Sequence, residues 1–481
     1  MSGLNKILDT VNRLSGIRAS KTVAPKLSEG EFYYTKTAKS DFFTAGFGKR
    51  AVIPNDIDTK KYYIAGYGDN NPARGVIDPQ YVSAVWLDDN SGKGGMLFIS
   101  LDVVGLLNKD VNKLKQRLSD FKIKTGCRNI TVFSTHNHAG IDTMGLWGPL
   151  PLTGKNKKFM ELLFSSCVEA AFDAFNSKTD GKLYHGNIEV PDLQEDIRLP
   201  EVYSKTLTRF RFVPYNGSRE IWLINFASHS ESLQGCNHLV SADFPCYLRE
   251  RIRDKTGAET LYGVGAIGGM ISMKIDDERC LRDEHRLLES TRKIGYNLAD
   301  YALKIDNDKE VAPKISYITQ PFYISVENPL LTIAAFAGII SADRYFLPAP
   351  AIKTELTYME IGELPLLFIP CELFPELAYG GYLNEDQSAS GKGGEINPPP
   401  LIETAGNKDL IIYGLSNDEI GYVIPPNDYL LNEDKPYIEK AIDRLGRRHY
   451  EETNSAGPDT AKTISDTFIK VMKTVNKTKN S

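Results

Sequence analysis

The chain has 481 residues, of which 41% are hydrophobic and 25% charged, and its formal net charge at pH 7 is −5. This length exceeds what one hydrophobic core usually supports, so the sequence predicts one large α/β domain with insertions or two domains. A mean hydropathy of −0.30 and a pI near 5.9 are typical of a soluble globular protein without a broad basic surface. They argue against a nucleic-acid partner.

The N-terminal segment does not have the pattern expected of a secretory signal. Residues 1–21 have the spacing of a short amphipathic helix and lack the apolar core and small-residue cleavage site of a secretory signal. The longest apolar run, 330–340, is interrupted by Thr332 and has roughly half the ~20 residues that span a bilayer. We therefore expect no transmembrane segment and a cytoplasmic location, or secretion if a signal has been removed. The run itself predicts either buried core or the wall of an acyl-chain slot.

Strands are predicted to alternate with helices along the chain. β-branched and aromatic runs closed by polar turns predict strands at 81–87, 95–106, 129–135, 208–213, 221–228 and 364–370. Helical spacing predicts helices at 107–126, 156–177, 243–257 and 284–305. This alternation favours an α/β fold, a large layered single domain with mixed sheets flanked by helices.

The predicted domain occupies residues 29–478, after an N-terminal extension over 1–28. Within it, the Gly/Ser/Pro-rich stretch 384–400 predicts a surface loop, and the amphipathic spacing of 457–477 predicts a closing helix.

Six cysteines are scattered without close pairs, which indicates free thiols in a reducing compartment: Cys127, Cys167, Cys236, Cys246, Cys280 and Cys371. Cys236 and His238 form a Cys-x-His pair of the kind that can bind zinc. No second pair of matching spacing follows, so we do not expect a zinc site there.

Four of the seven histidines lie in two windows, STHNHAG and NFASHSESLQGCNH. Each window follows an apolar run at a predicted strand end, where the chemistry of layered α/β sheets gathers. Side chains alternate along an extended chain, so His136 and His138 share one face. A third ligand from a separate strand end, as His229 would provide, is what a catalytic zinc needs. Taken alone, His136 and His138 could instead cap the end of the strand and form local hydrogen bonds. The two windows together favour a metal site.

A carboxylate would complete this set, and Glu372 is the best candidate. It emerges after the strongly apolar run that ends at Pro370. A glutamate in that place is otherwise typical of the first turn of a helix.

The ordered motifs resemble a known family. They are AGFGKRAVIP, ISLDVVGL, STHNHAG, NFASHSESLQGCNHLVSADFP, the Pro-x-Glu after LLFI, SNDEIGYVIPPNDY and HYEETNSAGPDT. In this order they are similar to the N-terminal catalytic domain of the neutral/alkaline (non-lysosomal) ceramidases, over about residues 40–476. The resemblance implies one zinc ion per chain, held by His136, His229, Glu372 and Tyr422.

The resemblance also implies roles for four other residues. His138 would lie beside the substrate amide, Tyr450 matches a second active-site tyrosine, and Arg198 in EDIRLPEVY matches a substrate-contacting arginine. Ser272 in AIGGMISMK matches a serine that has been considered as the nucleophile, although a loop serine can equally bond the backbone.

The implied reaction is zinc-assisted hydrolysis of the amide bond of ceramide or a related N-acyl amine, giving fatty acid and amine. His138 would donate to the oxyanion or carry a proton to the leaving amine, with Tyr450 as a second donor. The attacking group stays open between water and Ser272. Trp147, in the loop after the histidine pair, would rim the entrance.

Two alternatives to the amidohydrolase stay open, and departures from the family pattern raise the first of them. The loop after His138 reads AGIDTMGLWGP, and the loop of Ser272 lacks the family's Pro-Asn. A catalytically silent, lipid-binding relative is therefore one alternative, and a metal-dependent esterase or lactonase with the same four ligands is the other. Secreted family members usually add a C-terminal β-sandwich that these residues do not match, so we expect a soluble or cytosolic N-acyl amine as substrate. The oligomeric state stays open.

Overall fold

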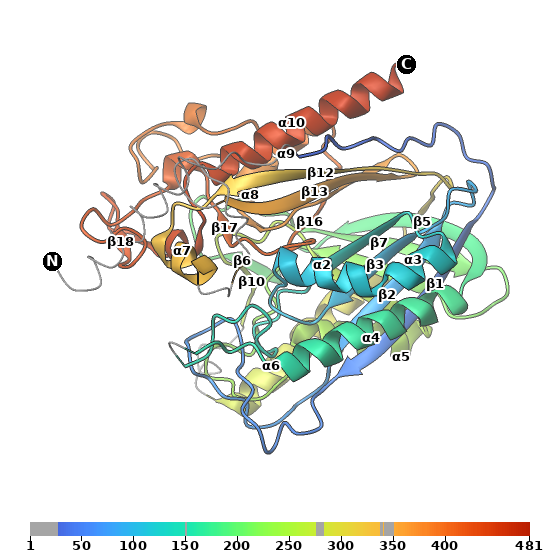
Figure 1. The fold of residues 1–481 in the computed structure, drawn as a ribbon, viewed down its shortest axis with the longest axis horizontal. Coiled ribbons are helices and arrows are strands. Elements are labelled where there is room, and N and C mark those ends of the chain that lie inside the picture. Colours follow the sequence, from blue (N-terminus) through green and yellow to red (C-terminus); the bar gives the residue numbers. More distant parts are fainter. Residues whose placement is uncertain (1–26, 150–151, 276–282, 337–339, 341–350) are drawn as a thin grey trace.

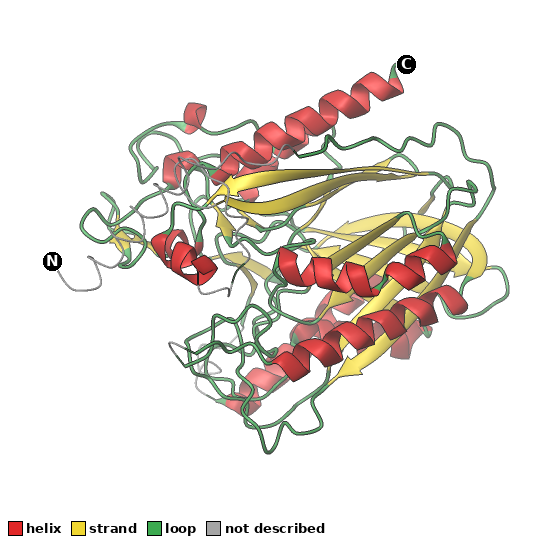
Figure 2. Ribbon diagram, viewed as in Figure 1, coloured by secondary structure: helices red, strands yellow, loops and turns green. Residues whose placement is uncertain are grey.

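The computed structural model describes residues 27–149, 152–275, 283–336, 340 and 351–481. Two β-sheets pack against each other and helices cover their outer faces (Figures 1 and 2). This arrangement confirms the predicted fold class, a layered α/β domain. Residues 1–26 of the predicted N-terminal extension lie outside the described residues.

The larger sheet has nine strands in the order β4-β3-β2-β1-β5-β7-β8-β9, with β11 paired to β5. The pairs β3–β4 and β8–β9 are parallel and the others antiparallel, so the sheet is mixed, as predicted. Its strands are β1 (Phe43–Val52), β2 (Gln80–Asp88), β3 (Met96–Leu101), β4 (Asn129–Ser134), β5 (Thr179–Glu189), β7 (Thr206–Pro214), β8 (Ile221–Phe226), β9 (Glu259–Val264) and β11 (Lys309–Glu310).

This sheet folds back on itself at β1. The strand pairs with β2 along Thr44–Val52 but with β5 only through Phe43–Ala45. The two halves turn toward each other as a result, and the Ser100 hydroxyl on β3 donates to the Tyr262 carbonyl on β9 at 2.6 Å. The C-terminal ends of β4 and β8, distant in strand order, are thereby brought together.

The smaller sheet has the order β12-β13-β14-β16. Aromatic rings join it to the larger sheet: Phe98 stacks on Phe368 with ring centroids 6.0 Å apart, and Phe133 contacts Tyr413 at 5.2 Å. Its strands are β12 (Ile315–Ser325), β13 (Ala351–Ile361), β14 (Leu364–Phe368) and β16 (Ile411–Tyr413). Three short pairs complete the strands: β6 (Gln194–Asp196) with β10 (Ile271–Met273), β15 (Glu372–Leu373) with β17 (Tyr422–Val423), and β18 (Ala441–Ile442) with β19 (Arg448–His449).

Helices cover each layer (Figure 1). Helix α4 (Lys157–Asn176) packs on β1 and β2 beside α2 (Asn108–Arg117) and α3 (Ser119–Thr125). Helices α5 (Phe244–Thr256) and α6 (Glu284–Leu303) pack on the β5–β9 half, and α10 (Thr460–Lys479) packs on β12. The shorter helices are α7 (Pro329–Phe336), α8 (Pro375–Tyr379), α9 (Leu401–Ala405), η2 (Gly394–Ile396), η3 (Pro426–Asp428) and η4 (Glu451–Asn454).

Two predicted elements differ from the structure. The strand expected over 95–106 ends at Leu101, because Asp102 turns inward to pair with Arg249 at 2.6 Å. The helix expected over 107–126 is divided at Leu118, whose ψ of 8° interrupts the helix.

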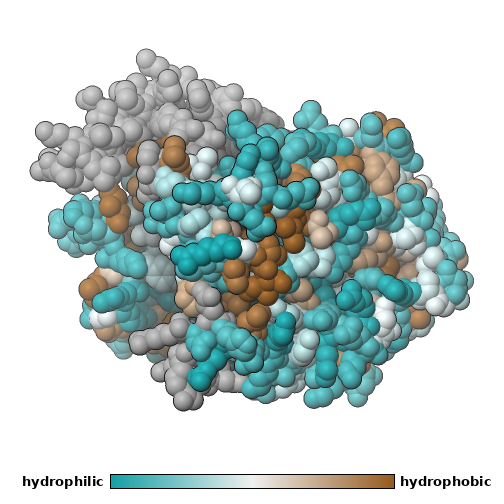
Figure 3. Space-filling view, turned by 90° about the horizontal axis from the view of Figure 1, so that it is seen from below, coloured by the Kyte–Doolittle hydropathy of each residue, from teal (hydrophilic) through white to brown (hydrophobic). Residues whose placement is uncertain are grey.

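One face of the molecule is mostly hydrophilic around a smaller hydrophobic patch (Figure 3). Within the part of the chain that the structure describes, no helix has the length and apolar character of a membrane span.

Candidate metal centre

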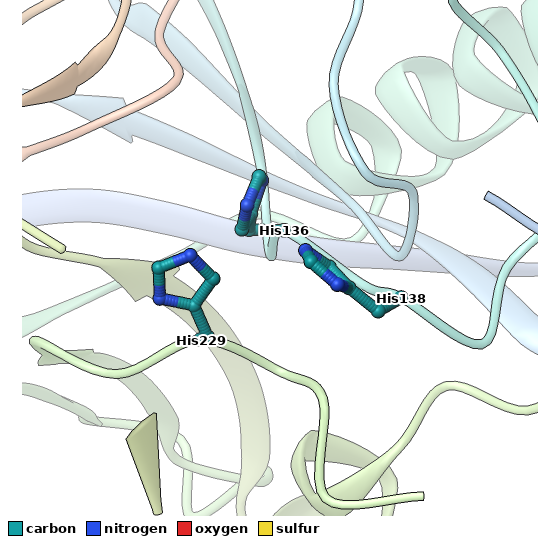
Figure 4. Close-up of side chains that lie close together, drawn as sticks. All are labelled: His136, His138 and His229. Carbon is teal, nitrogen blue, oxygen red and sulfur yellow. The ribbon is translucent and has the colours of Figure 1, made fainter. Parts of the chain in front are cut away.

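Three histidines meet where the two halves of the larger sheet approach each other. His136 and His138 follow β4 and His229 follows β8, and one ring nitrogen of each lies within 4.8 Å of the others. Asn137 and Ser230 form a parallel bridge, and the His138 amide donates to the Ser230 carbonyl at 2.9 Å, so the two windows run side by side. The three imidazoles point toward a common centre (Figure 4).

The backbone at this centre is strained at one position. His136 has a φ of 54°, in the left-handed region that residues other than glycine rarely adopt. Strain of this kind persists where the surroundings hold a functional side chain in place. Here the turn aims the His136 ring back toward the end of β8.

The main chain decides which nitrogens face the centre. Nδ1 of His136 lies 2.8 Å from the Val104 carbonyl oxygen, and Nδ1 of His229 lies 2.9 Å from that of Ile271. A carbonyl only accepts, so each Nδ1 carries the ring proton and each Nε2 presents a lone pair. Both Nε2 atoms lie 3.2 Å from Oε2 of Glu372. The two Nε2 atoms and Oε2 therefore direct their lone pairs at one point. Lone pairs repel one another, so this arrangement is favourable only when a cation or a shared proton lies between them.

A short parallel strand pair carries both predicted oxygen ligands. In the register of β15 with β17, Glu372 lies opposite Tyr422. Both side chains are buried. The Tyr422 ring stands nearly perpendicular to that of Tyr450, with centroids 6.4 Å apart, and its hydroxyl donates to Sδ of Met270 at 3.4 Å. The register therefore brings together the carboxylate and the phenol that the sequence predicts as ligands.

Burial and mutual contacts set the charges of these groups. Burial, assisted by His136, lowers the pKa of His138 to about 3, so its imidazole is neutral at physiological pH. Burial raises the pKa of Glu372, but His136 and His229 outweigh this and hold it well below its ordinary value. Burial and then Glu372 raise the pKa of Tyr422 well above its ordinary value, so its phenol stays protonated unless a cation binds it.

Sequence reasoning missed a carboxylate behind His138. Glu231 is 3% exposed, and its Oε2 accepts a hydrogen bond from the Tyr67 hydroxyl at 2.8 Å and lies 3.5 Å from Nδ1 of His138. The Ser272 hydroxyl donates to its other oxygen. Gly66, which comes directly before Tyr67, has a φ of 101°. A Cβ at this position would overlap the His138 ring, so the glycine allows the Tyr67 loop to lie against that ring. Glu231 therefore joins two groups of the predicted site.

Arg198 lies behind Tyr450. Its guanidinium pairs with the buried Glu451 carboxylate, which also accepts the Tyr450 amide at 3.0 Å. Burial raises the pKa of Tyr450 above its ordinary value, and Arg198 partly offsets this. The guanidinium thus supports the segment that carries Tyr450.

A cavity of about 310 Å³ opens beside the histidines. Burial raises the pKa of Asp418 in its wall to about 7, and burial and Glu372 raise that of Glu419 well above its ordinary value. Glu419 therefore favours the neutral form, and both carboxyls hold a proton more readily than an exposed carboxyl does. The lining residues, which include Trp147 as expected and members of the 330–340 run, are Gly66, Tyr67, Val104, Leu107, Asn108, His136, His138, Met144, Leu146, Trp147, Leu331, Ile340, Ile352, Glu372, Asp418, Glu419, Ile420, Gly421, Tyr422 and Asn454.

No family model matches the sequence, and no curated protein matches it. Solved structures do. The neutral ceramidase from Pseudomonas aeruginosa superposes with a TM-score of 0.66 at 17% identity, covering 90% of this chain and 75% of that one. A ceramidase complexed with C2 superposes with a TM-score of 0.67 at 15% identity, covering 91% and 76%. The fold is that of a neutral ceramidase. The resemblance inferred from the ordered motifs is confirmed at this level.

Within this ceramidase fold, the structure gathers most of the predicted site. His136, His138, Glu372 and Tyr422 line the cavity, and His229 completes the histidine group. The other three predicted residues lie behind this group. Ser272 contacts Glu231, Tyr450 contacts Tyr422, and Arg198 contacts Glu451. His238 lies apart, with its Nδ1 2.6 Å from the Asn71 side chain.

Proposed function

We propose that this protein is a zinc-dependent amidohydrolase that cleaves an N-acyl amine, with ceramide as the reference substrate, into fatty acid and amine. The observation that carries the proposal is the convergence of two imidazole Nε2 atoms on Oε2 of Glu372, at 3.2 Å each. Nitrogen and oxygen donors in this number are the set that zinc takes in catalytic sites. When bound, zinc supplies a Lewis acid that polarises the carbonyl and activates water.

His136, His229 and Glu372 would hold the ion, and Tyr422 would act as the fourth ligand. The Val104 and Ile271 carbonyls fix the ligand tautomers of the two histidines, which is how metal sites in proteins orient their imidazoles. Because the unpartnered imidazole of His138 faces the same cavity, it would contact the substrate beside the ion.

The cavity supports an acyl substrate. Leu107, Leu146, Trp147 and Leu331 give it an apolar wall directly beside the histidines. Ligand pockets of about 300–1,000 Å³ with such walls and a few polar groups at one end are typical of sites for small apolar molecules. An N-acyl chain would lie along this wall with its amide at the histidines.

Zinc content and turnover test the proposal together. We expect purified protein to hold about one zinc per chain and to hydrolyse N-acyl amines, with loss of both on His136→Ala. His285→Ala, on the exposed surface of α6, is the matched control and should change neither. A panel that pairs each amide with its ester separates an amidohydrolase from an esterase.

Two outcomes would contradict the proposal. Protein without zinc that is indifferent to chelators would indicate a silent, lipid-binding relative. Complete loss of turnover in Ser272→Ala with zinc retained would assign the attack to Ser272 in place of water.

A further inference from the structure

We propose that Asn137 is a positioning residue whose side-chain amide holds the turn that carries His136 beside His229. The inference rests on the proposed function, because it concerns how two of the four proposed ligands are kept at their mutual distance. Asn137 is not among the described residues that line the cavity, so it acts through the main chain that it holds.

The side-chain amide of Asn137 joins three segments of the chain. Its Nδ2 donates to the Asp102 carbonyl at 3.1 Å and to the Ser241 carbonyl at 2.7 Å, and its Oδ1 accepts the Ala139 amide at 2.9 Å. Asp102 follows β3 and Ser241 precedes α5. Carbonyls only accept and amide N–H groups only donate, so one orientation of the side chain satisfies all three partners. Asn137 is fully buried, and no water competes for these bonds.

The two residues whose carbonyls bond Asn137 are themselves anchored. The Asp102 carboxylate accepts both terminal nitrogens of the Arg249 guanidinium, at 3.0 and 2.6 Å. The Ser241 hydroxyl donates to the Asp78 carboxylate at 2.7 Å, and the Ser241 amide donates to the Ala139 carbonyl at 3.0 Å. Asn137 therefore bonds to groups that have fixed positions.

This anchoring acts on the strained turn of the metal centre. His136, directly before Asn137, has a φ of 54°, and a conformation of this kind persists only where the surroundings enforce it. The Asn137 amide donates to the Val103 carbonyl at 3.1 Å, and Asn137 forms the parallel bridge with Ser230, the neighbour of His229. The main chain of Asn137 thus sets the distance between the two histidine windows, and its side chain prevents the turn from relaxing.

The test uses the full-length protein loaded with zinc or cobalt(II). We expect Asn137→Ala to weaken zinc by about tenfold in a chelator competition, the lower end of what loss of the groups around a metal site typically costs. The visible absorption bands of the cobalt form should shift, because the turn relaxes and the His136 ring moves. Asn137→Ser, whose hydroxyl reaches only one of the two carbonyls, should show the same changes to a smaller extent. It decides the question if the alanine variant does not fold.

Asn328→Ala is the matched control, because Asn328 is also fully buried and makes the same three kinds of bond away from the histidines. Its Nδ2 donates to the Thr453 and Ser455 carbonyls at 2.9 and 3.0 Å, and its Oδ1 accepts the Leu330 amide at 2.9 Å. This variant should lose a comparable free energy of unfolding and keep the zinc affinity and cobalt spectrum of the wild type.

Two results would overturn the inference and leave the proposed function intact. One is wild-type zinc affinity and cobalt spectrum in folded Asn137 variants. The other is equal weakening of zinc in Asn137→Ala and Asn328→Ala, which would assign the effect to general loss of stability. A wild-type protein that binds no zinc would overturn both the inference and the proposed function.

Discussion

At the scale of single residues, sequence reasoning found the side chains that meet at the candidate metal centre and missed Glu231 behind His138. The windows around His136 and His229 were recognisable because two histidines shared a face and a third followed another apolar run. Glu231 stands in the polar run SHSES and has the appearance of a solvated side chain. Its burial follows from the bridge between the two windows, a contact that no local pattern contains.

Buried carboxyls also make stability depend on pH, and Glu376 on α8 is the clearest case. Burial raises its pKa to about 8, whereas an unfolded glutamate titrates near ~4.3. Between these values the folded state keeps a proton that the unfolded state has released, so this group lowers stability as pH rises through the window.

Glu376→Gln should remove that penalty. We expect its unfolding temperature to exceed that of the wild type by a few degrees at pH 8 and to match it near pH 4, in thermal unfolding at a series of pH values. Glu403→Gln, at an exposed position of α9, serves as the control. Parallel pH profiles for Glu376→Gln and the wild type would show that Glu376 does not titrate in this window.

At the scale of elements, several strongly apolar strands and the long helices were predicted, whereas other strands, among them β1 and β12, were not. β2, β4, β8 and β14 lie where expected. No strand was predicted at β1, which contains Gly46 and Gly48, or at β12, which contains Pro321, because both residue types usually weaken or interrupt strands. In β1 the glycines serve packing against α4.

Gly48→Ala tests that packing. A Cβ at this position would overlap the Ala170 carbonyl oxygen on α4, and main-chain atoms cannot move aside cheaply. We expect a loss of about 1–3 kcal/mol in the free energy of unfolding, measured by denaturant titration. Gly68→Ala is the control because a Cβ there meets nothing within 4 Å. Equal stability of the two variants would mean that α4 shifts to accommodate the methyl group.

At the scale of the whole molecule, alternation of strands and helices predicted a layered α/β fold, whereas the folding of the large sheet at β1 was not predictable. Fold class depends on local periodicity, but the meeting of β4 with β8 depends on how few residues of β1 pair with β5. The four metal ligands were predicted from the order of the motifs that resemble the ceramidases, because the geometry of the folded sheet could not be predicted.

Metal removal should therefore affect the whole fold. Zinc that binds the folded chain but not the unfolded chain stabilises the folded state by about 4 kcal/mol when the free zinc concentration is ~1,000 times its Kd. We expect a chelator to lower the unfolding temperature of the wild type and to leave that of His136→Ala unchanged. Restoration of the wild-type value by added zinc is the accompanying check. An equal decrease in both proteins would mean that the chelator acts elsewhere.

The fold brings together residues that are distant in sequence, which gives it a high contact order. His136, His229, Glu372 and Tyr422 come from distant parts of the chain and become neighbours only after both halves of the sheet have closed and β15 has paired with β17. Loop-closure entropy must be overcome before such contacts form, which makes folds of this topology slow to mature. Catalytic competence would accordingly be among the last properties acquired during folding, so turnover by a variant reports that its entire topology is in place.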